Sequence, residues 1–185
     1  MTKMKTVLAA VAIITSVAAP AFAKEKSVEV GGAAMYASKD IIENAVNSKD
    51  HTTLVAAVKA AGLVDTLKGP GPFTVFAPTN EAFNKLPAGT VDTLLKPESK
   101  ATLTKVLTYH VVSGKTDAKS LMAMIKKNKG SATLKTVSGG ELKASMSGKD
   151  VIITDEKGGT AKVTIADVFQ KNGVIHVVDT VLMPK

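Results

Sequence analysis

The sequence predicts an α+β domain, with helices in the first half of the chain and an antiparallel sheet in the second. Between Ser38 and Lys127, apolar residues recur in several segments at the three- and four-residue steps of an amphipathic helix. From Ser131 onward, apolar and polar residues alternate between glycine-rich or acidic turns, which is typical of an antiparallel meander. A third segment, Gly71 to Pro87, reads as a buried strand that leads directly into a helix. This segment would join the sheet to the helices.

The composition argues against disulfides and against dedicated nucleic-acid binding. The 185 residues contain no cysteine, so packing rather than disulfides must hold the domain together. All 24 basic side chains are lysines, and the chain has two tyrosines and no tryptophan. Without arginine for bidentate contacts or aromatic rings for base stacking, we expect no dedicated nucleic-acid binding. The net positive charge still predicts a weak attraction to anionic surfaces, including an anionic membrane.

Residues 1–23 have the pattern of a secretory signal peptide. Lys3 and Lys5 precede an apolar run, Val7 to Ala19, that is too short to span a bilayer comfortably. Ala21-Phe22-Ala23 then offers a cleavage site before Lys24. We therefore expect the protein to be secreted or periplasmic, in the cell envelope or the extracellular space.

The rest of the chain is expected to form one domain. Residues 24–37 are small, polar and rich in glycine, without a sustained period, which predicts a flexible leader. Residues 38–185 show neither an internal repeat nor an interdomain linker, and they are enough for one proper core. We therefore predict a signal peptide, a short leader and a single folded domain.

Capping residues help to place the helices within this domain. Ser, Thr, Asn and Asp are favoured at the start of a helix, where the side chain accepts a free backbone N–H. Gly62 is well placed to end a helix, because glycine readily adopts the left-handed conformation found there. Apolar stripes accompany each of these signals, and Phe76 and Phe83 are expected in the core. The predicted helices begin near Ser38, Thr52, Glu81, Thr90, Leu103 and Asp117.

Asn172-Gly173 is the strongest hairpin signal in the second half of the chain. Both residue types tolerate a positive φ, as the tight turns of β-hairpins require. The turn would pair the strand around Val163 to Phe169 with a last strand around Val174 to Val178. His176 lies on that last strand, where we expect it half-buried and hydrogen-bonded to backbone.

The sequence contains no complete catalytic or metal-binding motif. Gly114-Lys115-Thr116 resembles the end of a phosphate-binding loop, but Tyr109 stands where that loop needs a glycine. G-x-S-x-G and S-x-x-K are both absent, and the three histidines are widely separated without a zinc-binding spacing. Asp155-Glu156 offers too few oxygen ligands for calcium. We therefore predict a protein that is not an enzyme and has no catalytic residue, cofactor or metal.

Three segments resemble, in order, the signatures of the fasciclin domain, an extracellular adhesion module. They are TVFAPTNEAF (Thr74 to Phe83), LTYHVVSG (Leu107 to Gly114) and NGVIHVVDTVLMP (Asn172 to Pro184). The resemblance implies a fasciclin-like fold, an antiparallel β-sandwich or wedge with several α-helices packed along one edge. It also implies a secreted, non-enzymatic adhesion module whose partner is a cell-surface or matrix protein or polysaccharide.

An alternative function also fits such a fold. A lipid or other small apolar ligand could be carried between the sheet and the helices, in the envelope or the extracellular space. That function requires an apolar cavity, whereas adhesion requires an exposed patch.

The resemblance also suggests partner-contact residues. In animal members of the family, a tyrosine-histidine segment and an Asp-Ile pair are associated with integrin binding. The matching residues here are Tyr109, His110, Asp167 and Val168. For Tyr109-His110 a structural role is the favoured interpretation, because His110 ends the helical stripe formed by Leu103, Val106 and Leu107.

Overall fold

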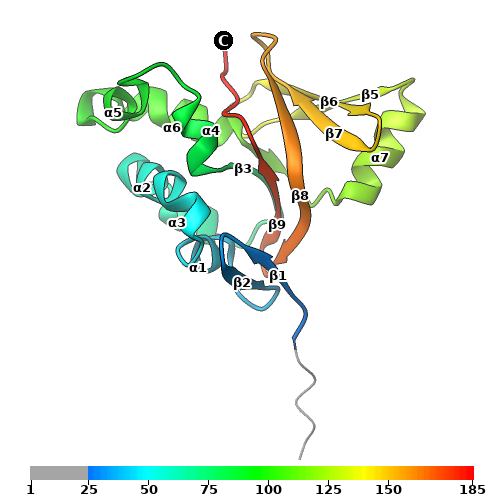
Figure 1. Cartoon of the computed structure of the whole chain (residues 1–185), viewed down its shortest axis with the longest axis horizontal. Helices are drawn as coiled ribbons and strands as arrows, with labels where there is room; N and C mark the ends of the chain where they lie inside the picture. The colour runs from blue at the N-terminus through cyan, green and yellow to red at the C-terminus, as the bar shows by residue number, and fades with distance from the viewer. Residues whose placement is uncertain (1–24) are drawn as a thin grey trace, which may run out of the picture.

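The computed structural model describes residues 25–185, so the predicted signal peptide lies outside the described residues. A seven-stranded sheet runs through the middle of the fold, with most helices on one side of its central strands (Figure 1). Its spatial order is β4-β3-β9-β8-β7-β6-β5. The strands are β3 (Phe73–Pro78), β4 (Val111–Ser113), β5 (Ser131–Lys135), β6 (Glu141–Ser147), β7 (Asp150–Thr154), β8 (Thr160–Gln170) and β9 (Gly173–Val178).

Neighbouring strands are antiparallel except for β3 and β9, the second and third strands in this order, which run parallel. We call β3 and β9 the central strands. A parallel pair needs a long crossover, and here the chain between Pro78 and Gly173 forms it. The edge strands β4 and β5 also approach each other. Val112 pairs with Thr136, and the Val137 N–H donates to the Val111 carbonyl at 2.8 Å. The sheet therefore curls into a nearly closed wedge.

The helices confirm most of the predicted boundaries. Thr79 caps α4, Asp117 caps α7, and Gly62 ends α2 in the left-handed conformation with φ 73°. At α1 the cap is Asp40 rather than Ser38, since Asp40 and Glu43 form a reciprocal capping box. The helices are α1 (Ile41–Ala45), α2 (Thr52–Ala61), α3 (Val64–Lys68), α4 (Asn80–Asn84), α5 (Thr90–Leu94), α6 (Lys100–Tyr109) and α7 (Ala118–Lys127).

The predicted flexible leader is wrong for residues 27–36. These residues form an antiparallel hairpin of β1 (Ser27–Val30) and β2 (Ala33–Tyr36), which turns at Gly31-Gly32 with positive φ at both glycines. Val30 and Met35 are buried in the helix-side core. Each strand contributes a single buried residue, and that is too little to give a visible period in the sequence. The hairpin is therefore part of the folded domain.

The prediction for Asn172-Gly173 is correct about the β8–β9 hairpin and wrong about the turn. Gln170 pairs with Gly173, so the two connecting residues are Lys171 and Asn172, and neither Asn172 nor Gly173 has a positive φ. Gly173 is required because a Cβ there would overlap the carbonyl oxygen of Phe73 on the parallel strand. A close backbone approach, rather than turn chemistry, explains this glycine.

Asn172 connects three elements through its buried side chain. Its Oδ1 accepts the Ile41 N–H at 3.1 Å, at the start of α1. Its Nδ2 donates to the carbonyl of Leu67 at 2.7 Å and to that of Gly69 at 2.9 Å, at the end of α3. One amide side chain therefore fixes two helix ends against the sheet.

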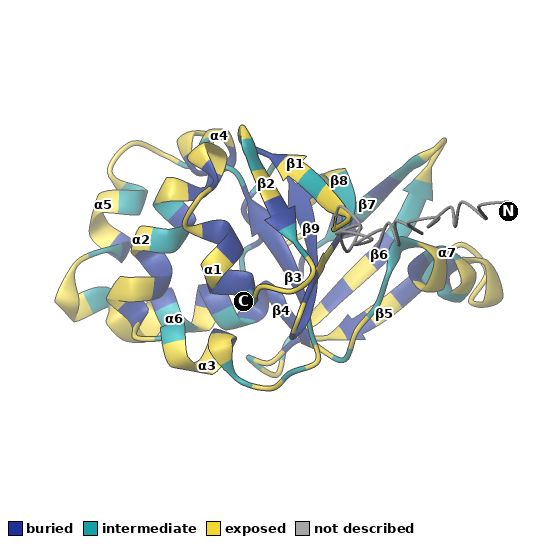
Figure 2. Ribbon diagram, turned by 90° about the horizontal axis from the view of Figure 1, so that it is seen from below, coloured by how far each residue is buried: buried dark blue, intermediate teal, exposed yellow. Residues whose placement is uncertain are grey.

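Two apolar cores lie on opposite faces of the central strands. Val75, Ala77 and Ile175 face the core beneath the helices, whereas Phe76 and Val178 face the core inside the curled sheet. Phe83 is buried with the helices, as predicted. Figure 2 shows buried positions on the inner sides of the helices and along β3 and β9, with exposed positions on the outer sides of the helices.

We expect Asn172→Ala to lower the free energy of unfolding by about 2–4 kcal/mol, because the Ile41 N–H and the carbonyls of Leu67 and Gly69 lose a buried partner. The urea midpoint measures this change. Asn84→Ala, at an exposed position at the end of α4, is the matched control and should stay within about 0.5 kcal/mol of the unsubstituted chain. Equal midpoints for the two variants would contradict the role of Asn172.

Candidate functional site

Tyr109, the first of the predicted contact residues, is fully buried at the end of α6, inside the curled sheet. Its hydroxyl donates to the Glu141 carbonyl at 2.7 Å and accepts the Glu156 N–H at 3.0 Å. Burial raises the pKa of this phenol above its ordinary value. Gly140 leaves room for the ring, because a Cβ there would lie 2.7 Å from Tyr109 Cε2. Tyr109 therefore ties α6 to two turns of the sheet.

His110 is also interior, with 2% of its surface exposed. Nδ1 lies 2.8 Å from the Val106 carbonyl, which can only accept, and Nε2 accepts the Leu182 N–H at 2.9 Å. These partners fix the neutral tautomer with the proton on Nδ1. Burial lowers the pKa of His110 to about 4. The ring therefore holds the C-terminal segment against α6.

The Asp167-Val168 pair lies in an irregular part of β8, where the register with β9 shifts between Ile165 and Val168. Val168 is completely buried. Asp167 has a φ of 58°, and its Oδ1 accepts the Ala118 N–H at 2.7 Å at the start of α7. The bulge turns this carboxylate toward the start of α7. There it accepts a backbone N–H that the helix leaves unpaired, and its negative charge is stabilised by the positive end of the helix dipole.

His176 connects these two segments. Its ring stacks on Phe76 with a centroid separation of 5.7 Å, and the Phe76 N–H donates to the His110 carbonyl at 2.9 Å. The Nε2 atom of His176 donates to the Thr116 carbonyl at 2.8 Å, while the Nδ1 atom of the same ring accepts the Asp167 N–H at 3.4 Å. Burial lowers the pKa of His176 below its ordinary value. His176 is therefore fully buried rather than half-buried as predicted, and both of its ring nitrogens have backbone partners.

The structure therefore brings the two predicted contact segments together, but inside the protein. Tyr109, His110 and Val168 have almost no exposed surface in this conformation, which favours the structural interpretation, and contact of these residues with a partner stays a prediction. Asp167 is partly exposed, and one oxygen of its carboxylate is already hydrogen-bonded to Ala118. Their geometry serves to join α6, α7 and the sheet.

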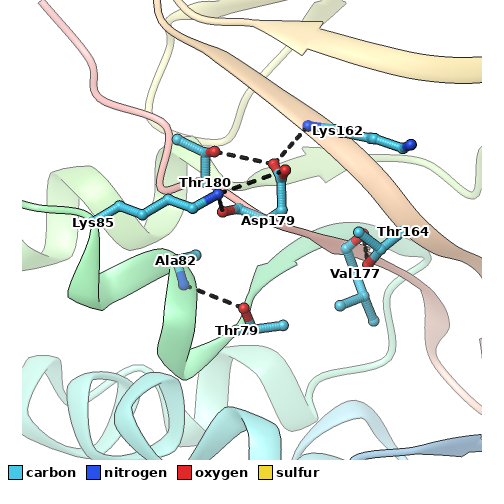
Figure 3. A network of polar contacts seen from close by, with 8 residues as sticks. All are labelled: Thr79, Ala82, Lys85, Lys162, Thr164, Val177, Asp179 and Thr180. Carbon is cyan, nitrogen blue, oxygen red and sulfur yellow. Dashed lines mark hydrogen bonds and ion pairs between the residues drawn. The ribbon is translucent and has the colours of Figure 1, made fainter.

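Asp179 plays a similar joining role after β9 (Figure 3). Its Oδ1 accepts the Lys162 N–H at 2.9 Å and the Thr180 hydroxyl at 3.0 Å, and Lys85 Nζ lies 3.6 Å from Oδ2. Partial burial alone would raise the pKa of Asp179, but these hydrogen bonds, with the Lys85 charge, hold it below its ordinary value. This carboxylate links β8, α4 and the C-terminal segment.

The exposed surface carries a different feature, a group of lysines on and beside α7. We call this group the α7 basic surface, and all of its lysines are exposed. Among residues 25–185, ion pairs form only at Lys85–Asp179 and Lys162–Asp150, so none of the group is paired. Beside it lies a groove of about 550 Å³, lined in part by Met122 and Met146. The α7 basic surface comprises Lys115, Lys119, Lys126, Lys127, Lys129 and Lys149.

Residues 25–185 offer neither a metal-binding cluster nor a membrane-spanning helix. Within this range, no group of three or more histidine, aspartate or glutamate side chains is arranged to hold a metal ion. None of the helices described there has the length and apolar character needed to cross a membrane.

A sequence model of the Fasciclin domain matches residues 49–184. The chain belongs to the fasciclin family. This fasciclin protein is 47% identical over 164 residues to protein sll1483 of Synechocystis sp., a match that covers 86% of this chain and 82% of that protein. It is 33% identical over 168 residues to the cell surface glycolipoprotein MPB83 of Mycobacterium bovis, covering 88% of this chain and 69% of the relative.

A solved structure supports the same fold. It is a FAS1 domain pair from the insect cell adhesion molecule fasciclin I, with a TM-score of 0.69 and 19% identity. The match covers 78% of this chain and 51% of the insect chain, so one fasciclin domain corresponds to about half of the pair. The predicted family and the predicted α+β fasciclin fold are therefore confirmed.

We expect His110→Ala to lower the free energy of unfolding by about 1–3 kcal/mol, because it leaves a cavity and an unpaired Leu182 N–H. Thr102→Ala, at an exposed position of the same helix, is the control and should change stability by less than about 0.5 kcal/mol. Thermal and urea unfolding measure both changes. A His110→Ala variant that keeps full stability but loses adhesion would restore the contact role.

Stability should also fall as the pH is lowered from 7.5 to 5. The ordinary histidine pKa is 6.5, and burial lowers the pKa of His51, His110 and His176 in the folded protein. Unfolding below pH 6.5 therefore takes up protons that the folded state excludes, at about 1.4 kcal/mol per pH unit for each proton. The contribution of the three neutral histidines to the free energy of unfolding is fully present above pH 6.5. The contribution of His110 is lost progressively as the pH falls from 6.5 to its folded-state pKa of about 4. A urea midpoint that stays constant over this interval would refute the prediction.

Proposed function

We propose that this fasciclin domain is a secreted, non-enzymatic binding module that contacts anionic polymers of a cell surface or extracellular matrix through the α7 basic surface. Its family and fold support the general class, since relatives include a cell surface glycolipoprotein and a cell adhesion molecule. The charge on and beside α7 supports this surface as the contact. The segment from Lys115 to Lys129 exposes five lysines against a single acidic residue, Asp117, whose Oδ1 accepts the Ser120 N–H.

The helix dipole accounts for only part of this charge. Lys126 and Lys127 lie in the last turn of α7, where positive charge is favourable. Lys119 lies in the first turn and Lys115 just before it, where positive charge opposes the dipole. Lys115 has a structural role, because its ammonium group lies 4.7 Å from the centre of the Phe169 ring. The helix dipole does not explain Lys119. A surface that attracts negative charge does.

The buried histidines support binding rather than catalysis. His110 and His176 each have both ring nitrogens engaged with backbone groups. Their pKa values are lowered by burial, so they are neutral and shielded from a substrate at the surface. A binding module needs neither a nucleophile nor a general base.

The test is retention of residues 24–185 on immobilised heparin, used as an anionic polysaccharide probe. We expect the variant with Lys119, Lys126, Lys127 and Lys129 all changed to Gln to elute at lower salt, because fewer counterions are released on binding. The matched control changes Lys59, Lys68, Lys96 and Lys100 to Gln, which removes the same charge from exposed positions on α2, α3, α6 and the loop before α6.

The control variant should elute close to the unsubstituted domain. Melting temperatures of both variants show whether the domain is still folded. Equal losses of retention in the two variants would mean that net charge, and not the α7 basic surface, governs binding. If the α7 variant elutes at the same salt concentration as the unsubstituted domain, the α7 basic surface does not bind the anionic polymer.

A further inference from the structure

An apolar cavity lies between the helices and the sheet, away from the α7 basic surface. Its volume is about 50 Å³, and its walls come from α1, α2, α3, α6 and the central strands. Ile41, Leu54, Val58, Val75 and Ile175 are among the side chains that form these walls. The space is therefore suited to hydrocarbon rather than to a charged group.

One polar side chain in this lining has an unused hydrogen-bonding atom. His51, just before α2, is 2% exposed and lines the cavity. Its Nδ1 lies 2.9 Å from the Ser48 hydroxyl, but its Nε2 has no hydrogen-bond partner within residues 25–185. The Ala77 backbone is near enough to raise the His51 pKa, although it is not in hydrogen-bond geometry. Burial has the larger effect and lowers the pKa, so the ring is neutral.

An unpaired buried nitrogen is unusual in folded proteins, since almost all such atoms have a partner. Water is a poor candidate here, because a buried water needs two to four polar partners and the other walls are almost entirely apolar. His110, the other histidine in the lining, already uses both of its ring nitrogens. The missing partner should therefore be a single polar group attached to an apolar body.

We propose that this cavity is a binding site for a small apolar molecule that carries one hydroxyl group, with the hydroxyl at His51 Nε2. A hydroxyl group both donates and accepts, so it can pair with Nε2 in either neutral tautomer of the ring. A carboxylate would gain little, because the neutral ring supplies no compensating charge in this apolar setting. The hydrocarbon part would pack against Leu54, Val58 and Ile175.

The lining also offers a route toward the surface. Val137 belongs to the cavity wall and is 46% exposed, and Thr66 of α3 is an exposed member of the same wall. The enclosed volume is smaller than a six-carbon alcohol, so the far end of such a chain would extend toward these residues. This site would give the domain the carrier function that the sequence leaves open beside adhesion.

The experiment titrates residues 24–185 with 1-hexanol and, separately, with n-hexane, and follows the methyl NMR signals of Leu54, Val58 and Ile175. We expect 1-hexanol to shift these signals and to raise the melting temperature. His51→Leu should weaken 1-hexanol binding about fivefold to tenfold, as expected for the loss of one hydrogen bond. It should leave hexane binding within about twofold.

A second variant keeps the proposal testable if His51→Leu does not fold. Ala45 lines the cavity, so Ala45→Leu should fill it and remove the methyl shifts for both probes while His51 is unchanged. Absence of shifts in the unsubstituted chain would overturn the site. Unweakened 1-hexanol binding to His51→Leu, or to Ala45→Leu, would overturn it as well.

Discussion

The parallel pairing of β3 with β9 is the constraint on which the rest of the fold depends. Both strands are buried on both faces, so one face must supply a core beneath the helices and the other a core inside the curled sheet. The backbones approach so closely that Gly173 cannot carry a Cβ beside the Phe73 carbonyl. Every other element covers one face of this pair or extends its sheet.

Buried polar side chains then fix these layers in position. Asn172 holds the ends of α1 and α3, His110 holds the C-terminal segment, and Tyr109 holds two turns of the sheet. Each of these groups satisfies backbone atoms that would otherwise be unpaired in the interior, where such atoms strongly destabilise the fold. The residues that resemble fasciclin signatures are therefore largely those that join one element to another.

The two binding regions that we propose lie apart in this arrangement. The α7 basic surface lies beside the curled sheet and offers unpaired positive charge, while the cavity lies beneath the helices on the other side of β3 and β9. Asp167 and Asp117 hold the start of α7 through backbone N–H groups, which fixes the helix that carries the charge. Contact with a polymer and uptake of a small molecule could thus occur without competition for residues.

The sequence by itself determined the local features whose cause lies within a few residues. The caps at Thr79 and Asp117, the end of α2 at Gly62 and the buried strand Phe73 to Ala77 all follow from neighbouring residue types, and the family signatures lie at fixed places in this pattern. The tertiary structure decided the features that depend on distant partners. Whether Tyr109 and His110 faced solvent depended on Glu141 and Leu182, and the reason for Gly173 was the Phe73 carbonyl, a hundred residues earlier in the chain. The unpaired His51 nitrogen became visible only in the assembled core, because a missing partner can be recognised only when every neighbour is in place.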